Sequence, residues 1–184
     1  MFEHLRGADG KFLFDEHGKP ITRALSDHEK RNLKPGQDGK ISIANNGIFN
    51  DVDAAAKYAS QHSTTAGPQY LIHFPEANNG VSELLIAGYQ KFLENDFWGL
   101  SNSTQTTKDM MNQYGQGNLH FDGHSRGAMT IGNALESVQS QTNARGTLSG
   151  TTVNFFGAAY NAQQADGVLS PDFPLALYCG RAKH

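Results

Sequence analysis

From Lys40 onward the chain alternates short apolar runs with longer amphipathic segments, and few folds are compatible with that alternation. The apolar runs predict strands, and the segments whose apolar residues recur at helical spacing predict helices. The expected strands are 40–44, 69–74, 118–122, 152–156 and 175–178, and the expected helices are 51–61, 81–93, 104–114 and 126–141. Strands alternating with helices at this spacing favour an α/β fold, with a mostly parallel sheet and helices on both of its faces.

Residues 1–39 have a different character. They carry scattered charges and glycines, and their only compact apolar cluster is 12–14. The turn-forming residues of 15–20 predict a short hairpin, and Ser26 followed three residues later by Glu29 predicts a capped helix start. We interpret 1–39 as a linker or appendage and 40–184 as the catalytic domain.

Composition excludes several classes of protein. The 184 residues are 38% hydrophobic, which is enough for a core, and the net charge of -3 shows no overall basic excess for binding nucleic acid. The single Cys179 cannot form an internal disulfide. The longest apolar stretches, such as 84–87, fall far short of the roughly 18 residues of a membrane span, so we expect no stable membrane insertion. No zinc-like spacing and no phosphate-binding glycine loop occurs, so we expect neither a metal nor a cofactor.

The motif with the clearest chemistry is Gly123-His124-Ser125-Arg126-Gly127, between an expected strand and an expected helix. This Gly-x-Ser-x-Gly pattern is typical of a nucleophile elbow, in which glycines two residues either side of the serine let strand and helix pack closely. Ser125 would be the nucleophile, flanked by His124, and the backbone N–H of Arg126 would donate to an oxyanion. The alternative is that Gly123 and Gly127 only form a tight connection.

A second oxyanion donor is expected from the loop after an earlier strand of the sheet. Asn46 and Gly47 follow the strand 40–44 directly and are the candidates, although they also fit an ordinary turn. Tyr160 and Asn161 follow the strand 152–156 and are candidates for lining the pocket, because strand ends at this edge usually carry site residues.

The partners of the serine are harder to assign. In hydrolase order the acid and the histidine follow the nucleophile, and the only downstream aspartates and histidine are Asp166, Asp172 and His184. His73 and His120 are interpreted as structural residues within strands, and His62 only as the end of a helix. The short stretch after Ser125 predicts a pared-down or truncated fold, or a scaffold turned to different chemistry.

With the motif at 123–127, its continuation 133–135, and the upstream segments 46–48 and 54–56, the chain resembles lipase-like α/β-hydrolases. More narrowly, it resembles the variable C-terminal toxin domains of filamentous-haemagglutinin or CdiA-type proteins, which act in contact-dependent growth inhibition. The resemblance implies a reduced α/β-hydrolase-like fold. It also implies a toxin enzyme carried by a larger secreted or cell-surface protein, delivered into a neighbouring bacterium and neutralised in the producer by a cognate immunity protein. Residues 1–39 would then be the remnant of a segment used to enter the target cell.

Three functions therefore remain open. The first is a hydrolase that uses Ser125 on a lipid or other ester. The second is a metal-independent ribonuclease that cleaves tRNA, with His124, His120 and Arg126 as base, acid and phosphate-binding cation. The third is a hydrolase fold without catalysis that serves as a binding module.

Overall fold

A mostly parallel sheet forms the centre of the protein. The computed structural model describes residues 1–45, 52–63, 67–73, 98–124, 126–141 and 145–156; side chains of 98–102 and 126 are not among them. The described strands form one six-stranded sheet in the order β2-β1-β4-β3-β5-β6. They are β1 (Phe2–His4), β2 (Thr22–Ala24), β3 (Ile41–Asn45), β4 (Gln69–Ile72), β5 (Leu119–His124) and β6 (Thr151–Phe156).

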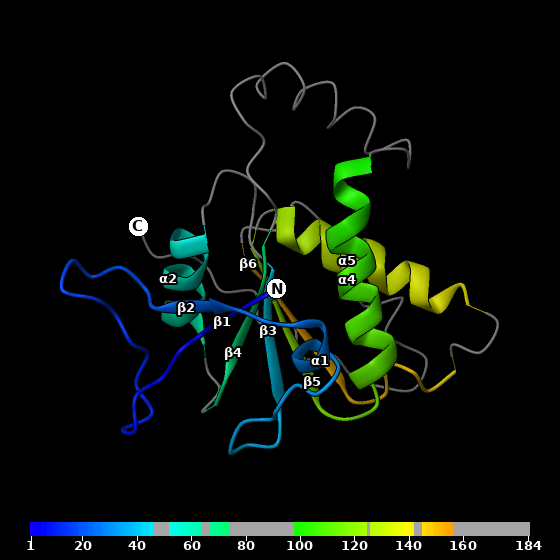
Figure 1. Cartoon of the computed structure of the whole chain (residues 1–184). Helices are drawn as coiled ribbons and strands as arrows, with labels where there is room; N and C mark the ends of the chain where they lie inside the picture. Colours follow the sequence, from blue (N-terminus) through cyan, green and yellow to red (C-terminus); the bar gives the residue numbers. More distant parts are fainter. Residues whose placement is uncertain (46–51, 64–66, 74–97, 125, 142–144, 157–184) are drawn as a thin grey trace.

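Helices cover both faces of this sheet. The described helices are α1 (Asp27–Lys30), α2 (Val52–His62), α4 (Trp98–Tyr114) and α5 (Arg126–Gln139). Figure 1 shows α2 on one face and α4 and α5 on the other. The α/β fold with a mostly parallel sheet and helices on both faces is therefore confirmed. The expected helix 81–93 and strand 175–178 lie outside the described residues.

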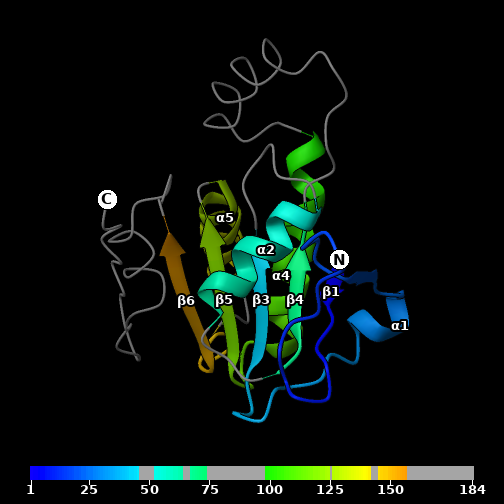
Figure 2. The same cartoon turned by 90° about the vertical axis from the view of Figure 1, so that its left-hand side faces the viewer.

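The four parallel strands end at the same edge of the sheet. β3 pairs in parallel with β4 and with β5, and β5 pairs in parallel with β6. In this register Asn45 lies beside Ile72 and Gly123, and His124 lies beside Phe156. Figure 2 shows the sheet face-on, with α2 in front and the carboxyl ends of these strands together. Ligand sites of parallel sheets are found at this edge.

The larger apolar core lies between the sheet and the pair α4 and α5. Residues of β5 alternate, so Leu119 and Phe121 point to this core and are fully buried. They pack with Met111 of α4 and with an apolar stripe on α5 that includes Ile131 and Leu135. The helical spacing of that stripe in the sequence therefore predicted the buried face of α5 correctly.

The first 39 residues belong to the sheet, so the interpretation of this segment as a linker or appendage is wrong. β1 pairs antiparallel with β4, placing Phe2 beside Leu71, and β2 pairs antiparallel with β1. Leu25 and Leu33 are buried in the larger core. Strands of three residues are too short to show a hydrophobic period, and only the pairing of β1 with β4 and of β2 with β1 defines them. The predicted hairpin is confirmed by the antiparallel bridge between Phe14 and Pro20.

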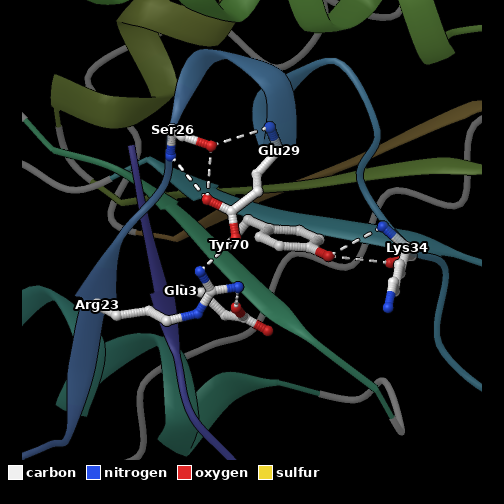
Figure 3. A network of polar contacts seen from close by, with 6 residues as sticks. All are labelled: Glu3, Arg23, Ser26, Glu29, Lys34 and Tyr70. Atoms are coloured by element: carbon white, nitrogen blue, oxygen red, sulfur yellow. Dashed lines mark hydrogen bonds and ion pairs between the residues drawn. The ribbon is translucent and has the colours of Figure 1, made fainter.

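Polar contacts tie this N-terminal segment together (Figure 3). Arg23 of β2 forms ion pairs with Glu3 of β1 and with Glu29 of α1. The predicted cap is confirmed, because Ser26 and Glu29 form a reciprocal capping box. Hydrogen bonds from Ser26 and then from Arg23 lower the pKa of Glu29 to about 2. The Tyr70 hydroxyl of β4 accepts from the backbone N–H of Lys34 at 3.0 Å and donates to its carbonyl at 3.2 Å.

Candidate functional site

The Gly-x-Ser-x-Gly motif lies between a buried strand and a helix, as predicted. β5 ends at His124 and α5 begins at Arg126, so Ser125 is the one residue between them in the chain. β5 extends two residues further than expected and includes Gly123. Ser125 and the side chain of Arg126 lie outside the described residues. The backbone N–H of Arg126 nevertheless belongs to the first turn of α5, where N–H groups have no partner within the helix.

Both glycines of the motif are required by close contacts. A Cβ atom on Gly127 would lie 2.0 Å from the carbonyl oxygen of Asn45, at the end of β3. A Cβ atom on Gly123 would lie 2.8 Å from Ile131 and 2.9 Å from the Cα of Ala128, both in α5. Real side chains do not tolerate such distances to backbone atoms. The first turn of α5 can therefore lie against β5 and β3 only because glycine occupies both positions.

The neighbouring end of β3 is fixed to α4 by side-chain hydrogen bonds. Asn45 is 2% exposed, and its Nδ2 donates to Oγ1 of Thr107 at 2.9 Å. The Thr107 hydroxyl donates in turn to the carbonyl of Ser103 at 2.7 Å. Asn46 and Gly47, the predicted second oxyanion donors, follow this strand end and lie outside the described residues.

A pocket lies between α2 and the carboxyl ends of the parallel strands. Its apolar wall consists of small and aliphatic side chains from α2, β3 and β4, and its polar and aromatic residues come from α2, β3, β5 and β6. The lining residues are Ala44, Asn45, Ala55, Tyr58, Ala59, His62, Leu71, Ile72, Asp122, His124 and Phe156. Since His124 directly precedes Ser125, the pocket adjoins the proposed nucleophile in the chain.

Four rings form a continuous aromatic cluster in this wall. The ring centroid of Tyr58 lies 4.2 Å from that of His124 and 4.3 Å from that of His62. His62 continues the cluster to Phe156, at 4.9 Å. The sequence interpretation took His62 only as the end of a helix and so missed it. Its spacing of four residues from Tyr58 put both side chains on one face of α2, but only the fold brings that face to His124 and Phe156.

Two titratable side chains of the pocket, His124 and Tyr58, have pKa values shifted toward the neutral form. Burial, and then the charge of His62, lower the pKa of His124. Burial, and then the charge of Asp122, raise the pKa of Tyr58. At neutral pH His124 is therefore a neutral imidazole and Tyr58 a neutral phenol.

A second polar group lies on the same face of the sheet, between β5 and β6. Nδ1 of His120 lies 2.7 Å from the hydroxyl of Thr152, and its Nε2 lies 3.1 Å from Oδ1 of Asp122. Nδ2 of Asn154 donates to Asp122 at 3.1 Å. His120 is 6% exposed and both of its ring nitrogens are engaged. This geometry supports a structural role for His120 rather than a role as general acid in RNA cleavage. The other histidine that was expected within a strand, His73, lies just outside β4.

Of the predicted site residues, the structure brings His124, Gly123 and Gly127 together at one edge of the sheet. Other candidates lie outside the described residues, namely Tyr160, Asn161, Asp166, Asp172 and His184. Within the described ranges, no group of three or more His, Cys, Asp or Glu side chains could hold a metal ion. None of the helices in this part of the chain is long and apolar enough to cross a membrane.

Comparison with protein-family models, with curated proteins and with solved structures finds no match for this chain.

Proposed function

We propose that this protein is a serine hydrolase of reduced α/β-hydrolase-like fold, with Ser125 as its nucleophile. The observation that carries the proposal is the junction of β5 and α5, where a single serine separates strand from helix. The contacts that require Gly123 and Gly127 give this junction the packing that a nucleophile elbow needs.

The chemistry follows from this arrangement. The Ser125 hydroxyl attacks the carbonyl of an ester, and the backbone N–H of Arg126 donates to the oxyanion that forms. The loop at Asn46 and Gly47 supplies the second donor. The aliphatic wall formed by Ala44, Ala59 and Leu71 suits the acyl part of a lipid or other ester.

We further propose that this hydrolase is the toxin domain of a contact-dependent growth inhibition protein. Support for this part comes from the sequence resemblance at 123–127, 133–135, 46–48 and 54–56. The domain would belong to a larger secreted or cell-surface protein, act inside the target bacterium and bind a cognate immunity protein in the producer.

The test is expression of the domain in the cytoplasm of bacteria, followed by measurement of growth, lipids and total RNA. Ser125→Ala should abolish growth inhibition and ester hydrolysis while leaving the unfolding transition in place. His17→Gln changes an exposed residue of the N-terminal hairpin and serves as the matched control. Full toxicity of Ser125→Ala would rule out the hydrolase, and no change in lipids or RNA would favour a binding module.

One observation favours the ribonuclease as a second candidate. His62 and His124 line the same pocket, so two imidazoles are available there as acid and base for RNA cleavage. In this alternative His62 takes the role first given to His120, while His124 and Arg126 keep theirs. Cleaved tRNA in cells that express the domain, undiminished in Ser125→Ala, would identify this activity, and intact tRNA would exclude it.

A further inference from the structure

We propose that Thr152 of β6 is a nucleophile separate from Ser125, activated by His120 and able to take up an acyl group from an activated ester. The observation behind this assignment is a chain of three side chains, in which a hydroxyl contacts an imidazole and the imidazole contacts a carboxylate. All three belong to described strands. The site does not use Ser125 and does not depend on the proposed hydrolase function.

The pairing of β5 with β6 builds this chain of side chains. His120 and Asp122 are two residues apart on β5, so their side chains lie on the same face of the sheet. The parallel register places Thr152 beside His120 and Asn154 beside Asp122. Figure 2 shows the two strands side by side. Two short sequence patterns, each with a gap of one residue, thus meet across neighbouring strands.

The contacts of His120 fix the role of each ring nitrogen. Nε2 lies 3.1 Å from Oδ1 of Asp122, and a carboxylate oxygen only accepts, so Nε2 carries the proton. In the neutral imidazole Nδ1 is then the acceptor, and it lies 2.7 Å from Oγ1 of Thr152. The other acceptor near this hydroxyl, the carbonyl of Leu119, is farther away at 3.5 Å. The Thr152 hydroxyl therefore donates to the imidazole, as a nucleophile donates to its base.

Burial differs along this chain of contacts in the way that a reactive site requires. His120 and Asp122 are buried, and Nδ2 of Asn154 donates to the same carboxylate oxygen at 3.1 Å, so the base and the carboxylate are held in place. Thr152 is exposed, so a reagent can reach it from solvent. An accessible hydroxyl beside a base that a third group orients is the arrangement of an activated nucleophile. Asp122 acts here as a positioning residue for His120.

The reaction balances with an ester as the only reagent. Oγ1 of Thr152 bonds to the acyl carbon as its proton passes to Nδ1 of His120, and the bond from the acyl carbon to the leaving oxygen then breaks. The imidazolium gives the proton to that oxygen, so an alcohol or phenol leaves and His120 is neutral again. The product is an O-acyl threonine, an alkyl ester less reactive than the activated ester that formed it. One acyl group per chain is therefore expected at this site.

The experiment treats the wild-type protein and Ser125→Ala with p-nitrophenyl acetate and locates the acetyl groups by mass spectrometry. Thr152 should be acetylated at the same rate in both. Ser140 is the internal control and should react far more slowly, because its exposed hydroxyl donates to a backbone carbonyl rather than to an imidazole. His120→Gln should lower the rate at Thr152 by at least about a hundredfold, the usual contribution of a general base, whereas Thr152→Ser should retain it. An unchanged unfolding transition shows that each variant is folded.

A second measurement uses the wild-type protein and does not depend on the folding of a variant. Among the described contacts of His120, Asp122 is the charged group, and Thr152 and Asn154 of β6 are uncharged. The rate of Thr152 acetylation should rise with pH and level off once the imidazole has lost its proton, whereas a hydroxyl without a base reacts in proportion to hydroxide. Asp122→Asn should lower the level of this plateau, because an amide no longer fixes the proton on Nε2.

Three results would overturn the role of Thr152. The first is acetylation at the wild-type rate in His120→Gln, and the second is a rate at Thr152 no higher than at Ser140. The third is loss of Thr152 acetylation in Ser125→Ala, because the threonine would then depend on the proposed serine nucleophile.

Discussion

The two faces of the sheet differ in what they bury, although the same strands form both. Toward α4 and α5, β5 presents Leu119 and Phe121, which are buried in the larger apolar core. Toward α2, the same strand presents His120, Asp122 and His124. The apolar side chains that pack under α2 are smaller, chiefly alanines and Leu71.

The two faces therefore contribute differently: one holds most of the large apolar side chains, and the other holds most of the titratable groups described above. Large apolar side chains contribute most of the free energy of folding, so the face under α4 and α5 holds the fold together. Buried polar groups are usually partnered, and under α2 the side chains of His120 and Asp122 are partnered with each other. The titratable groups thus gather on the less apolar face, next to the strand ends where Ser125 follows.

The largest effect is expected from shortening a side chain on the apolar face. Phe121→Ala should lower the free energy of unfolding by about 3–5 kcal/mol, because it leaves a cavity under α5. Thr152→Ala, which removes the hydroxyl contacts with His120 and with the Leu119 carbonyl, should cost about 1 kcal/mol. Urea unfolding of both variants measures the difference, and equal losses would contradict the contrast between the faces.

A smaller loss is expected where α5 meets the strand ends. Gly127→Ala should destabilise the protein by about 1–3 kcal/mol or more, because the new Cβ would meet the Asn45 carbonyl. Gly117→Ala is the matched control, since its Cβ would lie 3.6 Å from the nearest neighbour, an ordinary contact. Thermal unfolding compares the two. A Gly127 variant as stable as the control would show that the close approach of α5 is not required.

Acid should weaken the α2 face selectively. Burial lowers the pKa of both His4 and His124 from the ordinary value of 6.5, and both lie on this face. The unfolded chain then binds more protons than the folded one below pH 6.5. Stability is therefore full above that pH and decreases as the pH falls through it toward the lowered values. Urea unfolding as a function of pH tests this: His4→Phe should reduce the decrease and the exposed-site variant His28→Gln should not.

The smallest effect is expected at the contact that holds the N-terminal segment to the sheet. Tyr70→Phe removes both hydrogen bonds to Lys34 and should cost about 1 kcal/mol. Faster hydrogen exchange at the Lys34 amide would accompany the loss. Unchanged exchange there would mean that these two hydrogen bonds do not help to hold the segment.

The sequence predicted the elements with strong local signals. The helical spacing of Ile131, Leu135 and Val138 predicted α5 and its buried face, and Ser26 with Glu29 predicted the cap of α1. Helix α4 begins at Trp98, earlier than the expected residue 104, because Ser, Thr and Asn at its start weaken the local signal. The prediction of a linker at 1–39 failed because its strands, of three residues each, are defined only by the pairing of β1 with β4 and of β2 with β1.

The sequence by itself determined the parallel α/β plan and the position of Ser125 between a strand and a helix, because both depend on periodicities and glycines that act over a few residues. The tertiary structure alone decided which histidines share a pocket. His62 and His124 are far apart in the chain, and only the packing of α2 across the sheet brings them both against Tyr58. The pairing of β5 with β6 likewise closes His120 into a hydrogen-bonded group with Thr152 and Asp122.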